Sequence, residues 1–511
     1  MAATGHNTSN KKSIQFWIFL AAPLLSLSIL LFTDLSPGKP QVTAMLAVAV
    51  LMALWWITEI IPLGITSLLP IVLFPVLGIM DGGDVSEVYF NDIIFLFLGG
   101  FLVAIAVQKW NLHKRIALWI LMKVGASPAR ILLGFMLATT LISMWISNTA
   151  TTMMMVPILI SIISKLEELN GAEKISQYSV GLLLAVGYSA TVGGITTLVG
   201  TPPNLSFVRI LKVNFPNAPE ITFSDWFLFA APITITLFLI FFIYLYLIFV
   251  RKKSEWKNIA SSQIETEYKQ LGKWSYEEKI VGLLFIIMAL LWFFRNEIQI
   301  GNFKILGWSS LFTHKEFLND GTVAIFIGII LFIIPSKTSK QKKLMNWQDV
   351  EKLPWDIILL FGGGFALASG MKESGLSLWC GEQLTFLGDF HPLLIILLIT
   401  LCITFIGEIS SNTAMVETFL PVLAGLALTL NVNPLLFMIP ATLGASMGFM
   451  LPIATPPNAI IFATRRIKMK QMIRAGFILN VVSVIVIAVF TYFLGTSIFE
   501  ISINEIPSWT H

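Results

Sequence analysis

Charged residues, histidine and cysteine are all scarce in this chain, and each shortage excludes a class of protein. Charged residues make up 12% of the 511 residues and hydrophobic residues 56%, which is too little charge to cover a soluble protein of this length. The two cysteines, Cys380 and Cys402, lie in apolar context and give neither a disulfide framework nor a metal motif. The five histidines form no metal-ligand cluster, and we expect His113 and His314 in loops.

Hydrophobic runs of bilayer length recur along the chain. About 20 apolar residues cover a hydrocarbon core of roughly 30 Å, so several runs span it, and the shorter ones need their flanks. The clearest runs are Ile14–Phe32, Thr43–Ile61, Phe227–Val250, Ile280–Phe294, Val323–Pro335, Ile357–Ala368 and Met472–Leu494. The sequence therefore predicts an all-α integral membrane protein without a separate soluble domain.

The N-terminal segment is polar over 13 residues and ends in Lys11-Lys12. The apolar run that follows is too long for the hydrophobic region of a signal peptide, and no small-residue cleavage site follows it. We therefore expect a retained first helix, with residues 1–13 in the cytoplasm and the protein in the inner (plasma) membrane.

Three sequence motifs occur twice, in the same order. The pairs are Asn91–Phe101 with Trp355–Phe365, Ile146–Pro157 with Ser410–Pro421, and Gly200–Asn204 with Ala454–Asn458. The first two pairs are offset by 264 residues and the third by 254. Chance is a poor explanation for three ordered matches, so we infer an internal repeat.

Positive charge gives the orientation of the two repeats. Six segments hold 26 of the 33 Lys and Arg residues, and the positive-inside rule places them in the cytoplasm. The stretch 129–164 then starts and ends inside, and 392–428 starts and ends outside, yet two spans would each need about 20 residues. We expect two re-entrant helical hairpins that enter from opposite sides, an inverted-topology repeat typical of transporters.

The expected organisation has about eleven transmembrane helices plus the two hairpins, with the C-terminus outside. The first repeat covers residues 14–250, with hairpin 129–164 and a broken helix at 180–212; a cytoplasmic connector covers 251–279; and the second repeat covers 280–511, with hairpin 392–428 and a broken helix at 434–464. Asn296–Asp320 is predicted to be a polar outer loop.

Each hairpin is predicted to turn at a Ser-Asn-Thr segment, Ser147–Thr149 in the first and Ser411–Thr413 in the second. Polar backbone at membrane depth must be buried in protein or line a cavity. The arriving half-helix ends in carbonyls that suit Na⁺, and the departing half-helix begins with free N–H groups that suit a carboxylate. The alternative is that these residues only cap the helices, and its weakness is that the motif occurs in both inverted repeats.

The Thr-Pro-Pro-Asn segments are predicted to break a second pair of helices. Two prolines remove backbone donors, which leaves carbonyls free at Val199-Gly200 and Ile453-Ala454. Glycines before each break, at Gly193-Gly194 and at Gly444 and Gly448, are expected to allow close packing against a hairpin tip. An ordinary proline kink is the alternative, but a kink needs only one proline.

The hairpin tips and the breaks contain no Lys or Arg. Helix-dipole ends contribute only about 0.3–1 kcal/mol each, up to about 2 when partly buried, which is small against the cost of burying two negative charges. Cations bound beside the anion are the natural compensation, and this is a physical reason for obligatory coupling.

Several carboxylates within or beside the apolar segments need a separate interpretation. Glu408 lies just before the second tip and Glu417 just beyond it, and each is either a proton site or a partner for a polar group of the fold. Asp92 and Asp356 begin equivalent helices and are expected to be N-caps. Glu59, at a helix end, is expected to be structural.

The paired SNT and TPPN motifs, together with the segment WWITEIIP, resemble the divalent anion:sodium symporter family of di- and tricarboxylate transporters over essentially the whole chain. The resemblance implies an elevator-type homodimer in which the hairpins and broken helices form a transport domain beside a scaffold domain. It also implies sodium-driven import of C4-dicarboxylates such as succinate, fumarate and malate.

The resemblance also implies site residues. The substrate carboxylate contacts would be Asn148, Thr149, Asn412 and Thr413, with Thr201 and Pro456 nearby. The first sodium site would be Ser143, Ser147, Asn148 and Gly200, and the second Ser410, Asn412, Ala454 and Gly407. Some relatives carry a hydroxyl-bearing residue where this chain has Gly407, which leaves backbone carbonyls to serve there.

Other functions remain open from the sequence. A sulfate or tricarboxylate carrier would differ only in the side walls of the pocket, and a sodium-independent dicarboxylate exchanger would keep its activity without sodium. A membrane-embedded enzyme needs a Ser/His or His/Asp/Glu cluster at one depth, which the sequence does not show. A channel needs a continuous pore, whereas two opposed hairpins favour alternating access.

Overall fold

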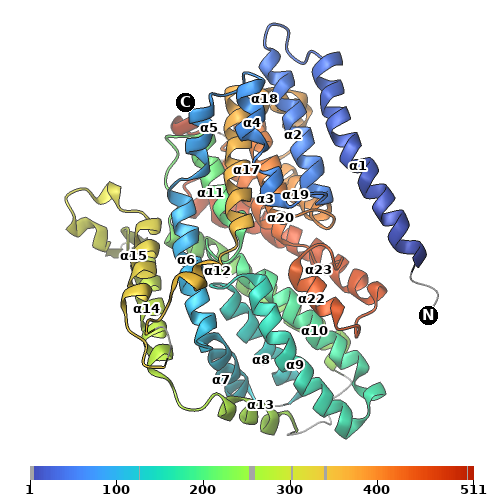
Figure 1. The fold of residues 1–511 in the computed structure, drawn as a ribbon, viewed down its shortest axis with the longest axis vertical. Coiled ribbons are helices and arrows are strands. Elements are labelled where there is room, and N and C mark those ends of the chain that lie inside the picture. Colours follow the sequence, from blue (N-terminus) through green and yellow to red (C-terminus); the bar gives the residue numbers. More distant parts are fainter. Residues whose placement is uncertain are drawn as a thin grey trace.

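The computed structural model describes residues 5–125, 127–251, 259–300, 303–338, 342–502 and 505–510. Within these ranges the chain is almost entirely helical, which confirms the predicted all-α class (Figure 1). Seven helices are long and apolar enough to cross a membrane, judged by length and composition, and six more are apolar but shorter.

The helices of the first half are α1 (Gly5–Phe32), α2 (Pro40–Thr58), α3 (Leu63–Thr66), α4 (Leu69–Val76), α5 (Gly82–Tyr89), α6 (Asp92–Lys109), α7 (Leu112–Val124), α8 (Pro128–Ser143), α9 (Asn148–Asn170), α10 (Ala172–Gly194), α11 (Pro202–Asn214) and α12 (Phe223–Leu245). A π-helical turn, Tyr246–Val250, extends α12. The helix α13 (Ile259–Gln270) lies within the predicted connector, of which residues 252–258 are outside the described ranges.

The second half contains α14 (Tyr276–Phe293), α15 (Asp320–Ile333), α16 (Trp347–Val350), α17 (Trp355–Glu373), α18 (Leu376–Gln383), α19 (Pro392–Gly407), α20 (Asn412–Thr429), α21 (Leu435–Ser446), α22 (Pro456–Ala463), α23 (Met469–Phe490) and α24 (Thr496–Ile498). The segment predicted to be a polar loop holds two short antiparallel strands, β1 (Ile298–Ile300) and β2 (Phe303–Ile305), followed by two 3₁₀ turns. The predicted polar N-terminal segment is helical from Gly5, and residues 1–4 lie outside the described ranges.

The two hairpins are the pairs α8–α9 and α19–α20. In Figure 1 the first lies in the lower half of the molecule, with α7 and α13 below it, and the second lies higher, near α18. The two broken helices are α10–α11 and α21–α22, interrupted between Gly194 and Pro202 and between Ser446 and Pro456. These breaks lie at the two Thr-Pro-Pro-Asn segments because proline cannot continue the i→i−4 hydrogen bonds of the preceding helix.

Three local expectations from the sequence were wrong. Asn91, not Asp92, is the N-cap of α6, since its Oδ1 accepts hydrogen bonds from the N–H groups of Ile93 and Ile94. Asp356 lies inside the first turn of α17, which begins at Trp355. His113 lies in the first turn of α7 rather than in a loop.

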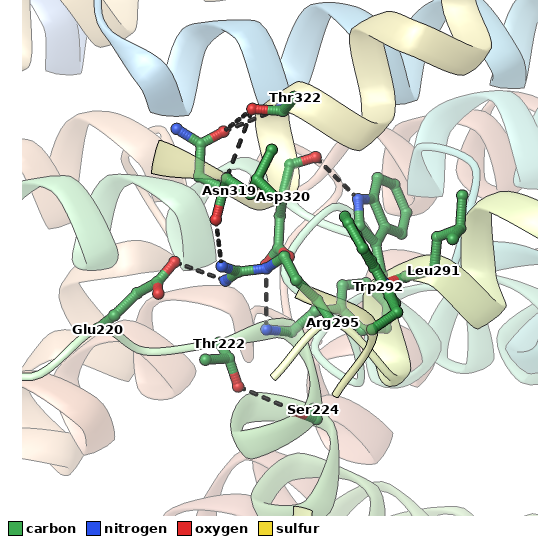
Figure 2. A network of polar contacts seen from close by, with 12 residues as sticks. Glu220, Thr222, Ser224, Leu291, Trp292, Arg295, Asn319, Asp320 and Thr322 are labelled. Atoms are coloured by element: carbon green, nitrogen blue, oxygen red, sulfur yellow. Dashed lines mark hydrogen bonds and ion pairs between the residues drawn. The ribbon is translucent and has the colours of Figure 1, made fainter. Parts of the chain in front are cut away.

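A buried arginine joins the segment before α12 to the end of α14 and the start of α15. Arg295 is 2% exposed; it donates from Nε to Asp320 Oδ1 over 2.6 Å and from Nη2 to Glu220 Oε1 over 2.6 Å. Figure 2 shows the guanidinium between these two carboxylates, with the Trp292 indole donating to the Asp320 carbonyl. Breaking a buried charge pair leaves the other charge uncompensated, so this network fixes the three segments together.

Candidate functional site

The first hairpin tip joins α8 to α9, and three oxygen atoms meet there. Ser143 Oγ lies 2.7 Å from Asn148 Oδ1 and 2.7 Å from the carbonyl oxygen of Ala190 on α10. One hydroxyl carries one proton, so it can donate to only one of these two acceptors at a time. Oxygen clusters with too few protons are the environment that hard cations select.

The first broken helix lies directly against this tip. Gly193 packs against the backbone of Thr140, and Gly194 packs against the amide of Asn148. In both places an added Cβ would overlap the neighbour, so only glycine permits the approach. The predicted close packing of the glycine pair against the hairpin is therefore present in the structure.

The break itself brings further carbonyl groups to the same place. Gly200 lies against the Gly194 carbonyl, and the position of a Cβ on Gly200 would be 3.0 Å from the Met144 carbonyl oxygen. Thr197 Oγ1 donates to that Met144 carbonyl over 2.5 Å. Three of the four residues implied for a first sodium site therefore meet here, namely Ser143, Asn148 and Gly200.

The fourth residue, Ser147, makes a different contact. Its Oγ accepts a hydrogen bond from the Ala150 N–H over 3.3 Å, as the N-cap of α9. Capping is therefore present for this hydroxyl, and its part in a sodium site stays a prediction. At the second tip, Ser411 occupies the N-cap position of α20 but makes no such side-chain bond.

The second hairpin tip contains buried polar atoms without partners. Ser410 Oγ and Asn412 Oδ1 form no hydrogen bond with any part of the chain that the structure describes, and neither does Ser446 Oγ at the end of α21. Each such atom costs about 1–3 kcal/mol, a cost that a bound cation offsets. Gly407 leaves room beside them, because a Cβ there would meet only the Ala445 carbonyl oxygen at 3.4 Å.

The glycines before the second break divide between two roles. Gly444 packs against Thr400 and Thr404 of α19, as expected for an approach to the hairpin, and Thr404 Oγ1 donates to the Gly444 carbonyl over 3.0 Å. Gly448 instead packs against Ala454, within its own break. A contact between Gly448 and the hairpin tip stays a prediction.

The residues implied for the substrate lie at the starts of helices. Thr149 and Thr413 follow the two tip asparagines, and the described residues offer neither hydroxyl a hydrogen bond. Thr201 is the N-cap of α11 without a side-chain capping bond, and Pro456 is the first residue of α22. Unpaired N–H groups at the starts of α9 and α20 are suited to carboxylates, whereas the proline pairs remove such donors from the starts of α11 and α22.

Two asparagines gained no role from the sequence, although both were visible as the residue that follows each proline pair. Asn204 Nδ2 donates to the Thr197 carbonyl over 2.8 Å, and Asn458 Nδ2 donates to the Leu451 carbonyl over 3.0 Å. These carbonyls occupy equivalent positions in the two breaks. The asparagines therefore close each non-helical segment onto the following helix.

Glu408 supports the second break. Its carboxylate accepts from the N–H groups of Phe449, Met450 and Leu451 at 2.8–2.9 Å, and from Asn480 Nδ2 at 2.6 Å. Four donors around one buried carboxylate satisfy its acceptor oxygens. Of the two interpretations left open by the sequence, Glu408 is a partner for polar groups of the fold.

The four motifs form one unit because the two repeats pack crosswise. The arm α9 of the first hairpin packs against α22, and the arm α20 of the second hairpin packs against α11. Each hairpin also packs against its own broken helix, α8 on α10 and α19 on α21. Packing between the two halves of the sequence thus joins two tips that are each built from one half.

A charged cavity of about 280 Å³ reaches this unit from one side. It is lined by Leu198 of the first break, by Asp92 at the start of α6 and by Arg209 and Lys212 on α11. Arg209 Nη1 lies 3.9 Å from Asp92 Oδ1, which is a loose ion pair. The fixed positive charge that the tips lack is therefore present on α11, beyond the break.

Comparisons with known proteins agree with this geometry. Residues 14–501 match the family model described as the sodium:sulfate symporter transmembrane region. A Staphylococcus saprophyticus protein named sodium-dependent dicarboxylate transporter SdcS is 42% identical over 495 residues, covering 95% of this chain and 92% of its own. The protein of the same name from Staphylococcus aureus strain NCTC 8325 is 43% identical over 491 residues, with the same coverage of 95% and 92%.

Two solved structures share the fold at low sequence identity. The efflux pump MtrF of Neisseria gonorrhoeae aligns with a TM-score of 0.55 at 12% identity, covering 92% of this chain and 98% of its own. The YdaH transporter of Alcanivorax borkumensis aligns with a TM-score of 0.50 at 12% identity, covering 81% of this chain and 87% of its own.

Proposed function

Because the chain belongs to the sodium:sulfate symporter family, we propose that it is a sodium-coupled symporter that imports C4-dicarboxylates such as succinate, fumarate and malate. The names of the two staphylococcal relatives support dicarboxylate and sodium as the transported pair. The observation that carries the proposal is the oxygen cluster of Ser143, Asn148 and Ala190, which has more acceptors than protons. The protein acts as a transporter in the plasma membrane and not as an enzyme.

Two sodium ions occupy equivalent positions at the two tips. The first is bound by Ser143, Asn148 and the backbone around Ser147 and Gly200. The second is bound by Ser410 and Asn412, whose buried oxygens lack other partners, with backbone at Gly407 and Ala454. Oxygen ligands of this kind suit hard cations.

The dicarboxylate binds between the tips, one carboxylate at Asn148 and Thr149 and the other at Asn412 and Thr413. The Thr201 hydroxyl, which makes no capping bond, and the Pro456 ring lie beside them at the starts of α11 and α22. Since the tips contain no Lys or Arg, the two sodium ions supply the charge that makes binding of a dianion favourable. Sodium and substrate therefore bind together.

Movement of the hairpins and broken helices as one body, within a homodimer, completes the mechanism. The crosswise packing of α9 on α22 and α20 on α11 supports this, because neither repeat can move its site alone.

A background lacking Cys380 and Cys402 allows single cysteine pairs between α9 and α6. A cross-link there should block uptake and depend on sodium; unchanged transport by the cross-linked protein would exclude an elevator.

Uptake into proteoliposomes tests the function. We expect labelled succinate to accumulate with an inward sodium gradient and not when choline replaces sodium. Equal uptake in both buffers would instead favour a sodium-independent exchanger. Sulfate and citrate are tested as competitors, because the family description names sulfate; stronger competition by sulfate than by fumarate would assign a sulfate carrier.

A further inference from the structure

The outgoing arms of the two hairpins differ in burial along one helical stripe. On α20 the stripe consists of Thr413, Ala414, Glu417 and Pro421, all buried. The equivalent residues on α9 are Thr149, Ala150, Met153 and Pro157, of which two are partly buried and two exposed. Residues at this spacing share one face of a helix, so the repeats differ over a whole surface and not at one residue.

Different neighbours account for the difference. The second arm, α20, packs against α17, α18 and α11. In the first repeat, α7 packs against the incoming arm α8, and no comparable packing joins α9 to α6 in the described chain. An apolar cavity of about 220 Å³ lies between α6 and α8, lined by Gly100, Leu141 and Trp145.

Glu417 is at the centre of the buried stripe and is 0% exposed. Its Oε1 hydrogen bonds with the Ser206 hydroxyl on α11, while its Oε2 has no partner in the described residues. The carboxyl group lies directly on Gly364 of α17, where an added Cβ would overlap it. Met153, at the equivalent position of the first repeat, is 60% exposed.

No countercharge compensates a negative charge on Glu417. The titratable groups on the helices packed against α20 are Arg209, Lys212, Asp356, Lys372, Glu373, Cys380, Glu382 and Cys402. Arg209 pairs with Asp92, and Lys372 donates to the Val213 carbonyl over 2.8 Å. In the described structure none of the eight forms an ion pair or hydrogen bond with Glu417. An ionised carboxylate buried in this way is strongly unfavourable, so the group holds its proton.

A proton fits this position better than a sodium ion. Sodium needs several oxygen ligands around it, whereas in the described residues the Glu417 carboxyl group forms one hydrogen bond, with the Ser206 hydroxyl, and lies on Gly364. A proton needs only one carboxylate oxygen. The site is also separate from both tips, since Glu417 lies more than one helical turn beyond Asn412 on α20.

We propose that Glu417 is a proton-binding site whose occupancy is linked to the conformational cycle. The proton is bound while α20 packs against α17. When the two repeats exchange their environments, the stripe of α20 becomes exposed as that of α9 is here, and the carboxyl O–H bond releases its proton to water. The inference rests on the proposed transport function, because only alternating access requires the exchange.

The equilibrium between the two conformations should depend on pH. Protonation stabilises the conformation in which Glu417 is buried, and deprotonation stabilises the conformation in which it is exposed. Raising the pH should therefore shift the population away from the conformation described here. Because Met153 cannot titrate, the effect comes from the second repeat alone.

Infrared spectroscopy of the purified protein, without transport, tests the proton directly. We expect wild-type protein to show the C=O stretch of a protonated carboxyl group, lost in Glu417→Gln and kept in Glu382→Gln, which alters an exposed carboxylate on neighbouring α18. Gly364→Ala should separate α20 from α17 and ionise Glu417. Its matched control is Gly100→Ala, at the equivalent position of α6, where the nearest atom to a Cβ is 3.6 Å away.

Uptake at a series of pH values tests the linkage. The rate of wild-type uptake should change severalfold as the pH is raised above neutral. Glu417→Gln cannot lose a proton, so its uptake rate should not change over the same range. Because the two proteins are compared at the same pH, the titration of succinate itself affects both equally. An infrared band unchanged by Glu417→Gln, or pH profiles identical in the two proteins, would overturn the proposal. Absence of any sodium-dependent uptake would overturn the transport function and leave the infrared result interpretable.

Discussion

The two hairpins carry the same motif, but their tips are in different states. At the first tip, Ser143 and Asn148 hydrogen bond with each other, and Ser147 caps the following helix. At the second, Ser410 Oγ and Asn412 Oδ1 are buried and have no hydrogen-bond partner among the described residues. The first hairpin borders an apolar cavity on α6, whereas the arm of the second is packed tightly against α17.

This difference follows from the use of inverted repeats. If both halves had the same surroundings, the molecule would be symmetric and its site would face neither side in preference. Under the alternating access that we propose, a structure with one arm packed and one arm exposed is one of two related conformations. The second is obtained by giving each repeat the surroundings of the other, which makes the equivalent positions of the repeats the most informative ones to change.

Replacement of the two tip asparagines should have the largest effect. Hydrogen bonds to charged groups contribute about 1.5–3 kcal/mol each, so Asn148→Ala and Asn412→Ala should each abolish sodium-driven uptake. Elution as a folded species on size exclusion, together with Asn170→Ala at the far end of α9 as control, separates this from misfolding. If only Asn148→Ala fails, the site belongs to the first repeat alone.

Glu408→Gln should lower stability strongly, because an amide cannot accept from all four donors that surround the carboxylate. Leaving buried donors unpaired costs about 1–3 kcal/mol each, so we expect a clear fall in the melting temperature of the purified protein. The first repeat has Met144 at this position, and Met144→Leu should leave the melting temperature nearly unchanged. Equal effects of the two substitutions would show that the breaks are stabilised by packing instead.

Two single substitutions, each giving one repeat the residue of the other, should change sodium affinity in opposite directions. Gly407→Ser adds a hydroxyl where space is available, and Ser143→Gly removes one. At about 0.5–1.5 kcal/mol per interaction, we expect a shift of roughly 2- to 12-fold in the sodium concentration that gives half-maximal uptake, downward for the first and upward for the second. Shifts of the same sign would contradict equivalent sodium sites.

The sequence predicted the repeated architecture well because its signals are local. Proline pairs, glycines and Ser-Asn-Thr turns determine where helices stop, and the structure has its breaks at these places. The interpretation of Asp92 failed because a neighbouring residue, Asn91, has the backbone geometry of a cap. The partners of Glu408 and Arg295, and the different burial of Glu417 and Met153, depend on which helices meet in three dimensions, so no local pattern contains them.

Membrane voltage should have the smallest effect, and it tests whether the cation count stops at the two repeat-related sites. Two sodium ions with one dianion carry no net charge, so voltage would do no work on the transported charge. The proton of Glu417 does not alter this count, since it is taken up and released on the same side when α20 leaves and rejoins α17.

A third sodium ion would carry one positive charge inward per cycle, worth about 2.3 kcal/mol per 100 mV. The resemblance to the divalent anion:sodium symporter family favours an extra ion beyond the two repeat-related sites, so we expect electrogenic uptake. Potassium gradients with valinomycin, set to either sign, measure it: uptake should be faster with a negative interior, and indifference to voltage would limit the ions to two.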